Sequence, residues 1–227
     1  RAKGLRVRRV SSDELRAGPT RDAIARIAAR WLSERGMAPM SFLVHLDPFS
    51  FAAERTCFVA EQHGHVVAFA GVIPVPARAG WFVEDLVRDA HAPNGTSELL
   101  VDATMRWAAA SGSRWVTLGL SPLAGEVSTL LRLARSTTAP LYDFEGVRSY
   151  KAKLRPHAWS PVYLAYPREQ TPVTAVLDSL GAFAGGDLVG FGARSLVARV
   201  SQTRNLGSLS VPRLLRRRSP SAPLAPC

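Results

Sequence analysis

An acidic pair stands at the end of an otherwise apolar segment, GWFVEDLVR at 80–88. Charges among strand-forming residues cost free energy unless they are paired or solvated in a cleft. One interpretation of Glu84 and Asp85 is a salt bridge at the end of a strand. The other is a carboxylate that orients or deprotonates a nucleophile, with Arg88 binding a phosphate. Asp85 and Arg88 are three residues apart, so on a strand they point to opposite faces unless a bulge intervenes.

The stretch at 142–156 mixes aromatic residues with four basic residues and a single glutamate, inside an otherwise charge-neutral part of the chain. If it is helical, Arg148 and Lys151 share a face with Glu145. A solvated charged helix is one interpretation. The alternative is a phosphate-binding strip, with Lys153 included and the carboxylate held for a substrate ammonium, which suits the end of a tRNA.

The turn at 91–96, HAPNGT, precedes a predicted helix, and free N–H groups at a helix N-terminus suit a phosphate. It holds one glycine, and Pro93 removes a donor. An ordinary turn at Asn94-Gly95 is therefore favoured over a coenzyme A cradle.

Other reactive groups lack partners in the sequence. His63 and His65 have no further ligands around them, so no metal site is expected. Cys57 has no neighbouring basic residue that would activate a thiolate. A Gly-x-Ser-x-Gly elbow is absent, since Gly119-Leu120-Ser121 only begins like one.

The formal net charge of +11 lies mainly at the two ends of the 227 residues. Residues 1–35 carry ten basic and four acidic side chains, and residues 204–227 carry five basic and no acidic ones, which leaves 14 of each between them. The RLLRRR run at 213–218 is typical of a disordered segment, and adhesion to an anionic membrane surface is the functional alternative.

Apolar runs and cysteines indicate the compartment. No run approaches the roughly 20 apolar residues of a spanning helix, and no apolar run follows the Arg-rich start as in a secretory signal. The two cysteines do not make a disulfide framework, so we expect a cytoplasmic, reducing environment.

Hydrophobic periodicity predicts alternating strands and helices. We expect a strand or arm at 1–10, a helix at 20–35 ended by Gly36, and a hairpin of strands 56–61 and 65–75. The later elements predicted are a strand at 80–88, a helix at 97–111 begun by Thr96 or Ser97, a strand at 114–120, helices at 126–135 and 171–184, and a strand at 161–166. We predict one domain over 1–203 and a disordered tail over 204–227.

Antiparallel strands that lead into a strand-turn-helix-strand crossover place the crossover strands in parallel. This order predicts an α/β fold of the GNAT acyltransferase type, a mixed central sheet flanked by helices.

Three segments together resemble one family: WFVEDLVR at 81–88, TLGLSPL at 117–123, and LYDFEGVRSYKAK at 141–153 with Pro156, Trp159, Pro161, Tyr163 and Leu164 after it. In this order and spacing they are similar to the C-terminal domain of the bacterial phosphatidylglycerol lysyltransferases, the multiple peptide resistance factor family. The similarity covers about residues 5–185. It implies the second half of a dual GNAT-like arrangement, with an N-terminal GNAT-like half as a missing partner.

The resemblance implies transfer of lysine or alanine from aminoacyl-tRNA to the hydroxyl of phosphatidylglycerol or a related anionic lipid, at the inner face of the bacterial membrane. It implies no metal and no coenzyme, since the ester on tRNA is already activated. The residue roles that it suggests are Asp85 for orienting the hydroxyl, Glu145 for the aminoacyl ammonium, and Arg88, Arg148, Lys151 and Lys153 for phosphates.

Two other enzyme classes stay open. One is a GNAT N-acetyltransferase that uses an acyl-CoA, which the single-glycine turn disfavours. The other is a peptidoglycan-type aminoacyl-tRNA-dependent ligase. A membrane-surface or RNA-binding module without a reaction is the non-enzymatic alternative.

Overall fold

A five-stranded sheet forms the centre of the computed structural model, which describes residues 4–34, 46–139, 142–187, 189–190 and 192–193. The strands follow the chain in the order β1-β2-β3-β4-β5. All neighbours are antiparallel except β4 and β5, which are parallel and joined through helix α3, as predicted. The strands are β1 (Leu5–Arg9), β2 (Thr56–Gln62), β3 (His65–Val75), β4 (Gly80–Arg88) and β5 (Trp115–Thr117).

The predicted hairpin of β2 and β3 is confirmed. Its two turn residues, His63 and Gly64, have φ angles of 50° and 80°. Two successive positive φ angles are typical of a type I′ turn, whose twist matches that of the flanking strands. The turn fixes the register in which Cys57 lies opposite Gly71 and Val59 opposite Phe69.

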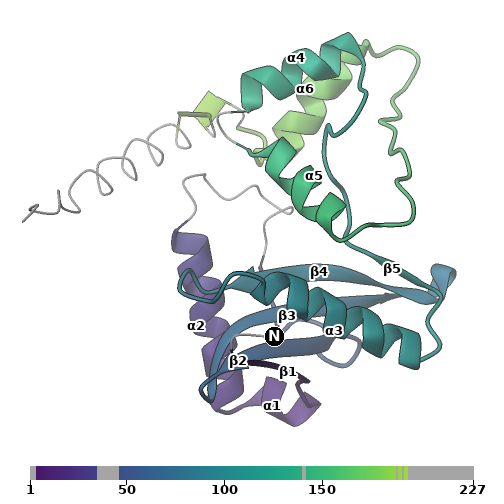
Figure 1. Cartoon of the computed structure of the whole chain (residues 1–227). Coiled ribbons are helices and arrows are strands. Elements are labelled where there is room, and N and C mark those ends of the chain that lie inside the picture. Colours follow the sequence, from purple (N-terminus) through teal and green to yellow (C-terminus); the bar gives the residue numbers. More distant parts are fainter. Residues whose placement is uncertain (1–3, 35–45, 140–141, 188, 191, 194–227) are drawn as a thin grey trace, which may run out of the picture.

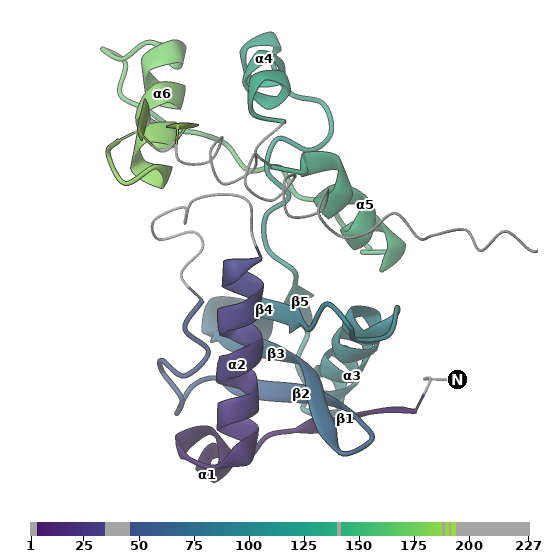
Figure 2. The same ribbon diagram turned by 90° about the vertical axis from the view of Figure 1, so that its left-hand side faces the viewer.

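Helices cover both faces of the sheet (Figures 1 and 2). One face packs on α2 (Pro19–Ser33), where Ile24, Ile27 and Ala28 recur at helical spacing and meet Phe69. The other face packs on α3 (Thr96–Ala110), where Leu100 meets Phe58 and other strand residues. Each fully buried large apolar side chain contributes about 1.5 to 3 kcal/mol, so these two clusters hold the sheet between its helices.

A short helix that the sequence did not predict, α1 (Ser12–Arg16), precedes α2. It begins with a capping box, in which the Ser11 side chain accepts from the Glu14 backbone N–H and the Glu14 side chain accepts from the Ser11 backbone N–H. Its one buried side chain, Leu15, joins the α2 cluster.

The remaining helices gather on one side of the molecule, beyond β5 (Figures 1 and 2). Neither α4 (Thr129–Thr138) nor α5 (Phe144–Lys153) has a buried residue. The third, α6 (Pro172–Phe183), confirms the helix predicted at 171–184 and buries Ala175. A 3₁₀ turn, η2 (Pro76–Arg78), links β3 and β4. None of the described helices combines the length and apolar character that a bilayer crossing requires.

Three predicted elements differ from the structure. The predicted strand at 161–166 is wrong, since this segment has no regular secondary structure and is exposed. Strand β5 spans only 115–117 rather than 114–120. Helix α4 begins at Thr129 because the Ser128 side chain accepts from the Leu131 backbone N–H and so caps the helix there. Gly36 and the predicted tail at 204–227 lie outside the described residues.

Candidate functional site

A β-bulge on β4 brings the two acidic residues of the sequence prediction to one place. Asp85 pairs with Gly71 of β3 and Val83 pairs with Val72, so Glu84 is an extra residue between them. A bulge re-aims the side chains around it. Glu84 and Asp85 therefore both reach the same guanidinium, although adjacent residues of a regular strand point to opposite faces.

That guanidinium belongs to Arg55, which immediately precedes β2. Its Nη1 donates to Asp85 Oδ2 and its Nη2 donates to Glu84 Oε2, each at 2.5 Å. The Arg55 and Asp85 side chains are only 5% and 9% exposed. Of the two interpretations of the acidic pair, the structure shows a buried ion pair, and its position beside a strand bulge leaves the catalytic interpretation open as well.

Gly71 makes room for the ion pair. A Cβ at this position would lie 2.9 Å from Asp85 Oδ2 and 3.0 Å from Arg55 Nη1. Real Cβ atoms essentially never come within 3.0 Å of another atom, so a larger residue here would displace the Asp85 carboxylate. The glycine on β3 is thus part of the site.

Burial is the main cause that raises the pKa of Asp85, to about 6. Glu84 and Asp47 raise this pKa further, whereas the Arg55 guanidinium lowers it. A carboxyl group with a pKa near 6 is a stronger base than an ordinary aspartate and is still ionised at neutral pH. Burial also raises the pKa of the nearby Cys57 thiol, to about 12, so Cys57 is no thiolate nucleophile.

Arg88 lies away from this cluster. The bulge falls between Val83 and Asp85, so it does not change the alternation from Asp85 to Arg88, and the two side chains point to opposite faces. Arg88 Nη1 donates to the Ala92 carbonyl at 3.2 Å, in the turn before α3.

The turn before α3 differs from its prediction in one respect. The N-cap is Gly95, at φ 94°, and neither Thr96 nor Ser97 caps the helix. Thr96 is fully buried, and its hydroxyl donates back to the Pro93 carbonyl at 2.6 Å. A positive φ favours glycine, which explains why the helix begins one residue earlier than predicted.

Helix α5 carries the other four predicted residues. Glu145 is 67% exposed and lies 3.5 Å from Arg135 Nη1, while Arg148 and Lys153 are exposed. Lys151 is half-buried, and its Nζ donates to the Gly119 and Leu120 carbonyls at 3.1 and 2.8 Å. Burial lowers its pKa. Lys151 therefore fastens α5 to the loop after β5 with two of its three donors.

A second, unpredicted residue of α5, Tyr150, lies against α3. The Tyr150 hydroxyl is buried near Ser97 and Glu98 at the start of α3. Burial, followed by the negative charge of Glu98, raises the pKa of Tyr150 to about 12. Tyr150 therefore places α5 near the N-terminus of α3, while Lys151 holds it to the loop after β5.

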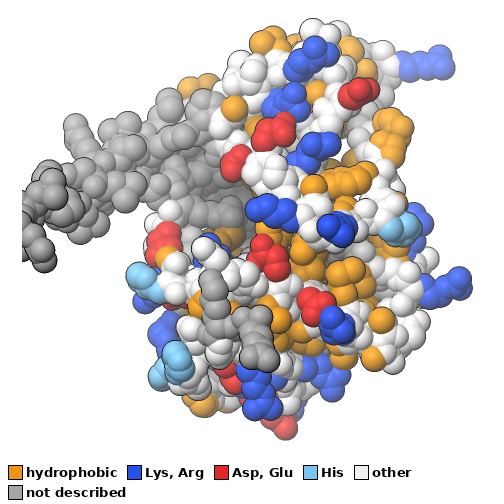
Figure 3. All heavy atoms as spheres, viewed as in Figure 1, with side chains coloured by type: hydrophobic (Ala, Val, Ile, Leu, Met, Phe, Trp, Pro, Cys, Tyr) orange, Lys and Arg blue, Asp and Glu red, His pale blue; other side chains and the backbone are white. Residues whose placement is uncertain are grey.

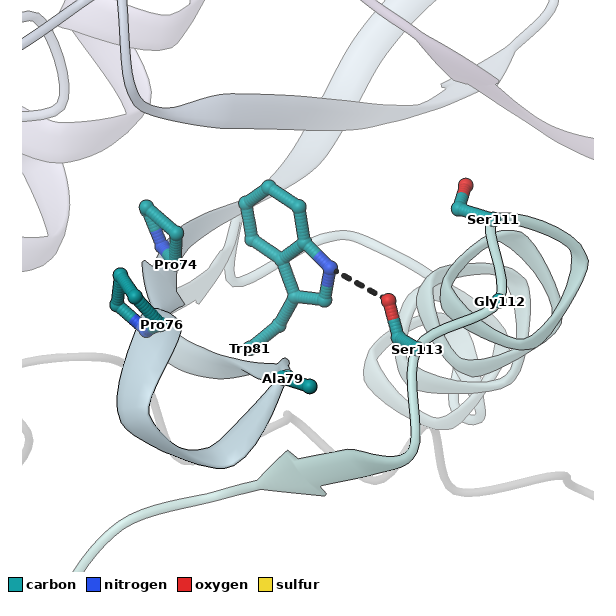
Figure 4. A pocket seen from close by; sticks show the side chains of 8 residues that line it. Pro74, Pro76, Ala79, Trp81, Ser111, Gly112 and Ser113 are labelled. Carbon is teal, nitrogen blue, oxygen red and sulfur yellow. Dashed lines mark hydrogen bonds between the residues drawn. The ribbon is translucent and has the colours of Figure 1, made fainter.

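A pocket elsewhere on the molecule carries no comparable chemistry (Figure 4). It lies between the start of β4 and the end of α3, where Trp81 Nε1 donates to Ser113 Oγ at 2.9 Å. None of its eight lining residues is acidic, basic or histidine. Among the described residues there is also no group of three His, Cys, Asp or Glu placed to hold a metal ion.

The sequence prediction missed Arg55 and Gly71. Arg55 lies 30 residues before Asp85, so only the pairing of β2, β3 and β4 brings them together. Two signals pointed to the site, namely a basic residue directly before a predicted strand and a glycine in the middle of one.

Comparison with known proteins identifies relatives of the whole arrangement. The family model described as phosphatidylglycerol lysyltransferase, C-terminal, matches residues 1–166. The phosphatidylglycerol lysyltransferase of Bacillus subtilis (strain 168) is 28% identical over 159 residues, which are 66% of this chain and 18% of that protein.

Two solved structures are similar in fold. One is the C-terminal domain of a protein assigned as a lysylphosphatidylglycerol synthetase from Agrobacterium fabrum, with a TM-score of 0.65, 23% identity and coverage of 81% of this chain and 56% of that one. The other is L-PGS from Bacillus licheniformis, with a TM-score of 0.57, 20% identity and coverage of 78% and 54%. The chain thus spans about half the length of these solved chains, and its fold is GNAT-like, as predicted.

Proposed function

Because the chain belongs to the family of phosphatidylglycerol lysyltransferase C-terminal domains, we propose that it transfers an aminoacyl group from aminoacyl-tRNA to a hydroxyl of phosphatidylglycerol. The amino acid is lysine or alanine. The family match covers β4 and α5, which carry all six predicted site residues. The observation that carries the proposal is Asp85, a buried carboxyl with a pKa of about 6, held beside a strand bulge.

The reaction needs a base but no further co-reactant. The lipid hydroxyl gives its proton to Asp85, and its oxygen bonds to the carbonyl carbon of the aminoacyl ester. The bond from that carbon to the ribose oxygen of the tRNA then breaks, and the proton passes from Asp85 to the ribose oxygen. A general base of suitable pKa contributes about 10² to 10⁴-fold to such a step.

In this proposal the exposed charged side chains of α5 bind the aminoacyl-tRNA donor. Arg148 and Lys153 are exposed and can approach phosphates of the tRNA acceptor end, and Lys151 keeps one donor for the same purpose. Glu145, whose side chain is mostly exposed, is the carboxylate that we assign to the aminoacyl ammonium. Arg88 is exposed and uses only its Nη1 for the Ala92 carbonyl, so its other donors can bind a phosphate.

In this proposal the segment at 157–166 contacts the lipid. Trp159, Val162, Tyr163, Leu164 and Tyr166 are exposed large hydrophobic side chains within it. Figure 3 shows hydrophobic side chains at the upper right-hand edge, where Figure 1 draws the chain between α5 and α6, with Lys and Arg side chains around them.

Charge and side-chain type favour a lipid surface for this segment. Residues 147–168 contain five basic and no acidic side chains. Aromatic residues flanked by cations suit the interface of an anionic membrane, and the aliphatic Val162 and Leu164 would add to burial there. In this proposal the domain lies at the inner face of the bacterial membrane, beside an N-terminal half. The matched region is about half of each solved chain, so those chains are long enough to include such a half.

The test is transfer of radiolabelled lysine or alanine from charged tRNA into vesicles that contain phosphatidylglycerol. We expect label in the lipid phase, reduced at least about 10²-fold by Asp85→Asn. Asp102→Asn is the matched control, since Asp102 forms an exposed ion pair with Arg106 on α3.

Two results would contradict the proposal. One is a folded wild-type protein that transfers neither amino acid. The other is unchanged transfer by Asp85→Asn. Acyl transfer from an acyl-CoA to an amine, together with saturable coenzyme A binding, would support the N-acetyltransferase instead.

A further inference from the structure

Among the described residues, Arg55 is the cation that pairs with both carboxylates on the bulge of β4. Its two terminal nitrogens are divided between two carboxylates, one nitrogen for each. Its Nε is buried and has no hydrogen-bond partner among the described residues. The side chain is thus committed to Glu84 and Asp85, at the cost of an unsatisfied buried donor.

We propose that Arg55 is a positioning residue: its guanidinium holds Glu84 and Asp85 on the bulge of β4 and presents the remaining oxygen of Asp85, Oδ1, to the acceptor hydroxyl. This inference rests on the proposed function, in which Asp85 accepts the hydroxyl proton. Arg55 itself touches neither substrate.

Three local irregularities meet at this one point of the sheet. The bulge adds Glu84 to β4, Gly71 leaves β3 without a side chain, and Arg55 places a charge in the interior just before β2. A tight turn delivers that arginine, since the backbone N–H groups of Glu54 and Arg55 both donate to the Phe51 carbonyl at 3.0 Å.

Fold stability alone does not account for this arrangement. Apolar side chains of similar volume stabilise an interior as well as a buried ion pair or better, because desolvation offsets most of the attraction. An arginine fork, by contrast, fixes the orientation of the carboxylates that it binds. A fixed carboxylate is what proton transfer to a positioned base requires.

Arg55 also moderates the charge of the site. Among the described residues, the groups that act electrostatically on Asp85 or are acted on by it are Arg55, Glu84, Asp47 and the Cys57 thiol. Arg55 is the only cation among them, and with Glu84 and Asp85 both ionised one guanidinium faces two carboxylates. Without it, burial and the neighbouring acids would keep Asp85 protonated to higher pH.

The test compares three variants of the 227-residue chain with the wild type. Arg55→Gln removes the cation, Arg55→Lys keeps a charge that cannot bridge two carboxylates in the same way, and Gly71→Ala keeps every charge but crowds Asp85 Oδ2 and Arg55 Nη1. The pKa of Asp85 is read from the ¹³C resonance of its carboxyl carbon, assigned with Asp85→Asn. The rate of aminoacyl transfer is measured against pH in parallel.

Arg8→Gln is the matched control. Arg8 also joins two carboxylates, Glu14 at 2.8 Å and Glu61 at 2.7 Å, but at β1 and away from the bulge. The Arg8→Gln variant shows how the loss of an arginine that bridges two carboxylates affects this fold in general. We expect it to lower the melting temperature and to leave the pH profile in place.

For Arg55→Gln we expect the pKa of Asp85 to rise, the acidic limb of the rate profile to move up with it, and the rate to fall about 10²-fold above that limb. Arg55→Lys should recover more of the pKa than of the rate. Gly71→Ala should lower the rate with a smaller change in pKa, because it moves the groups without removing charge.

Two results would overturn the inference. One is an Arg55→Gln protein with a lowered melting temperature but an unmoved acidic limb and an unchanged rate. The other is a pKa of Asp85 that does not respond to Arg55. Failure of the proposed function is distinguishable, because in that case the wild type itself transfers nothing.

Discussion

At the sheet, Arg55 and Asp85 are buried and paired, whereas most of the charged groups on α5 are exposed. Arg55 and Asp85 are held by two strands, a bulge and a glycine. Arg148 and Lys153 lie on a helix without a single buried residue. The comparison teaches that the two regions suit two tasks: a fixed carboxylate for proton transfer, and adaptable cations for a large polyanion.

Apolar side chains divide in the same way. Those on the sheet fill two clusters against α2 and α3. Those between α5 and α6 are exposed on a segment without regular structure. If this contrast reflects function, the apolar side chains on the sheet should determine stability, and those between α5 and α6 should determine lipid binding.

The largest difference in stability is expected between two truncations, one in each region. Phe69→Ala removes a fully buried ring and should lower the free energy of unfolding by about 3 to 5 kcal/mol. Tyr163→Ala removes a side chain that is 83% exposed and should change it by less than about 0.5 kcal/mol. Urea unfolding measures both. A cost at Tyr163 as large as that at Phe69 would break the comparison.

The binding half of this contrast has its own measurement. Replacing Trp159 and Tyr163 together with Ser should weaken sedimentation with phosphatidylglycerol vesicles about tenfold, because two interfacial aromatic side chains are lost. Phe51→Ser is the matched control, as Phe51 is also exposed but precedes β2. Equal loss in the control, or no loss in the double variant, would show that the 157–166 segment does not contact lipid.

Burial of Asp85 should also make the stability depend on pH. The pKa of Asp85 is about 6 in the folded protein against an ordinary value of 3.8, so the folded state binds this proton more tightly than the unfolded state. The free energy of unfolding should therefore fall as pH rises from about 4 to about 6, by on the order of 2 kcal/mol, and stay level above. Asp85→Asn should remove this slope.

Glu14 acts in the opposite direction and sets the lower limit of the measurement. Hydrogen bonding from the Ser11 backbone lowers the pKa of Glu14 from 4.5 to about 2, so its contribution is complete above pH 4.5 and is lost below. Urea unfolding between pH 4.5 and 7 thus isolates Asp85. A wild-type slope that survives in Asp85→Asn would mean that another group titrates there.

Local patterns predicted most of the sheet and little of the site. The hairpin, β4, α3 and the parallel β5 followed from periodicity, turn residues and the rule for crossovers. The bulge did not follow, because Glu84 and Asp85 are compatible with a regular strand and only the register with β3 places the extra residue. The contact between Arg55 and Asp85 depends on the pairing of three strands, and single-sequence patterns carry no information on such contacts.

The wrong strand at 161–166 has a different cause. Its Val and Tyr residues have high strand propensity, but that propensity depends on a neighbouring strand and a half-buried face. Among the described residues the sheet ends at β5, and the segment begins with Pro161 and is followed by Pro167. Composition alone does not separate an exposed extended segment from an edge strand.

The last and smallest effect sharpens the comparison within α5 itself. Lys151→Gln loses two hydrogen bonds to the Gly119 and Leu120 carbonyls and should lower the free energy of unfolding by about 1 kcal/mol. Lys153→Gln should leave stability unchanged but weaken tRNA binding a few-fold, with the slope of log affinity against log salt reduced by about 0.7 to 0.9. Filter binding at several salt concentrations, alongside urea unfolding, separates the two. If Lys153 affects stability as much as Lys151 does, then α5 is a structural helix throughout and the tRNA must bind elsewhere.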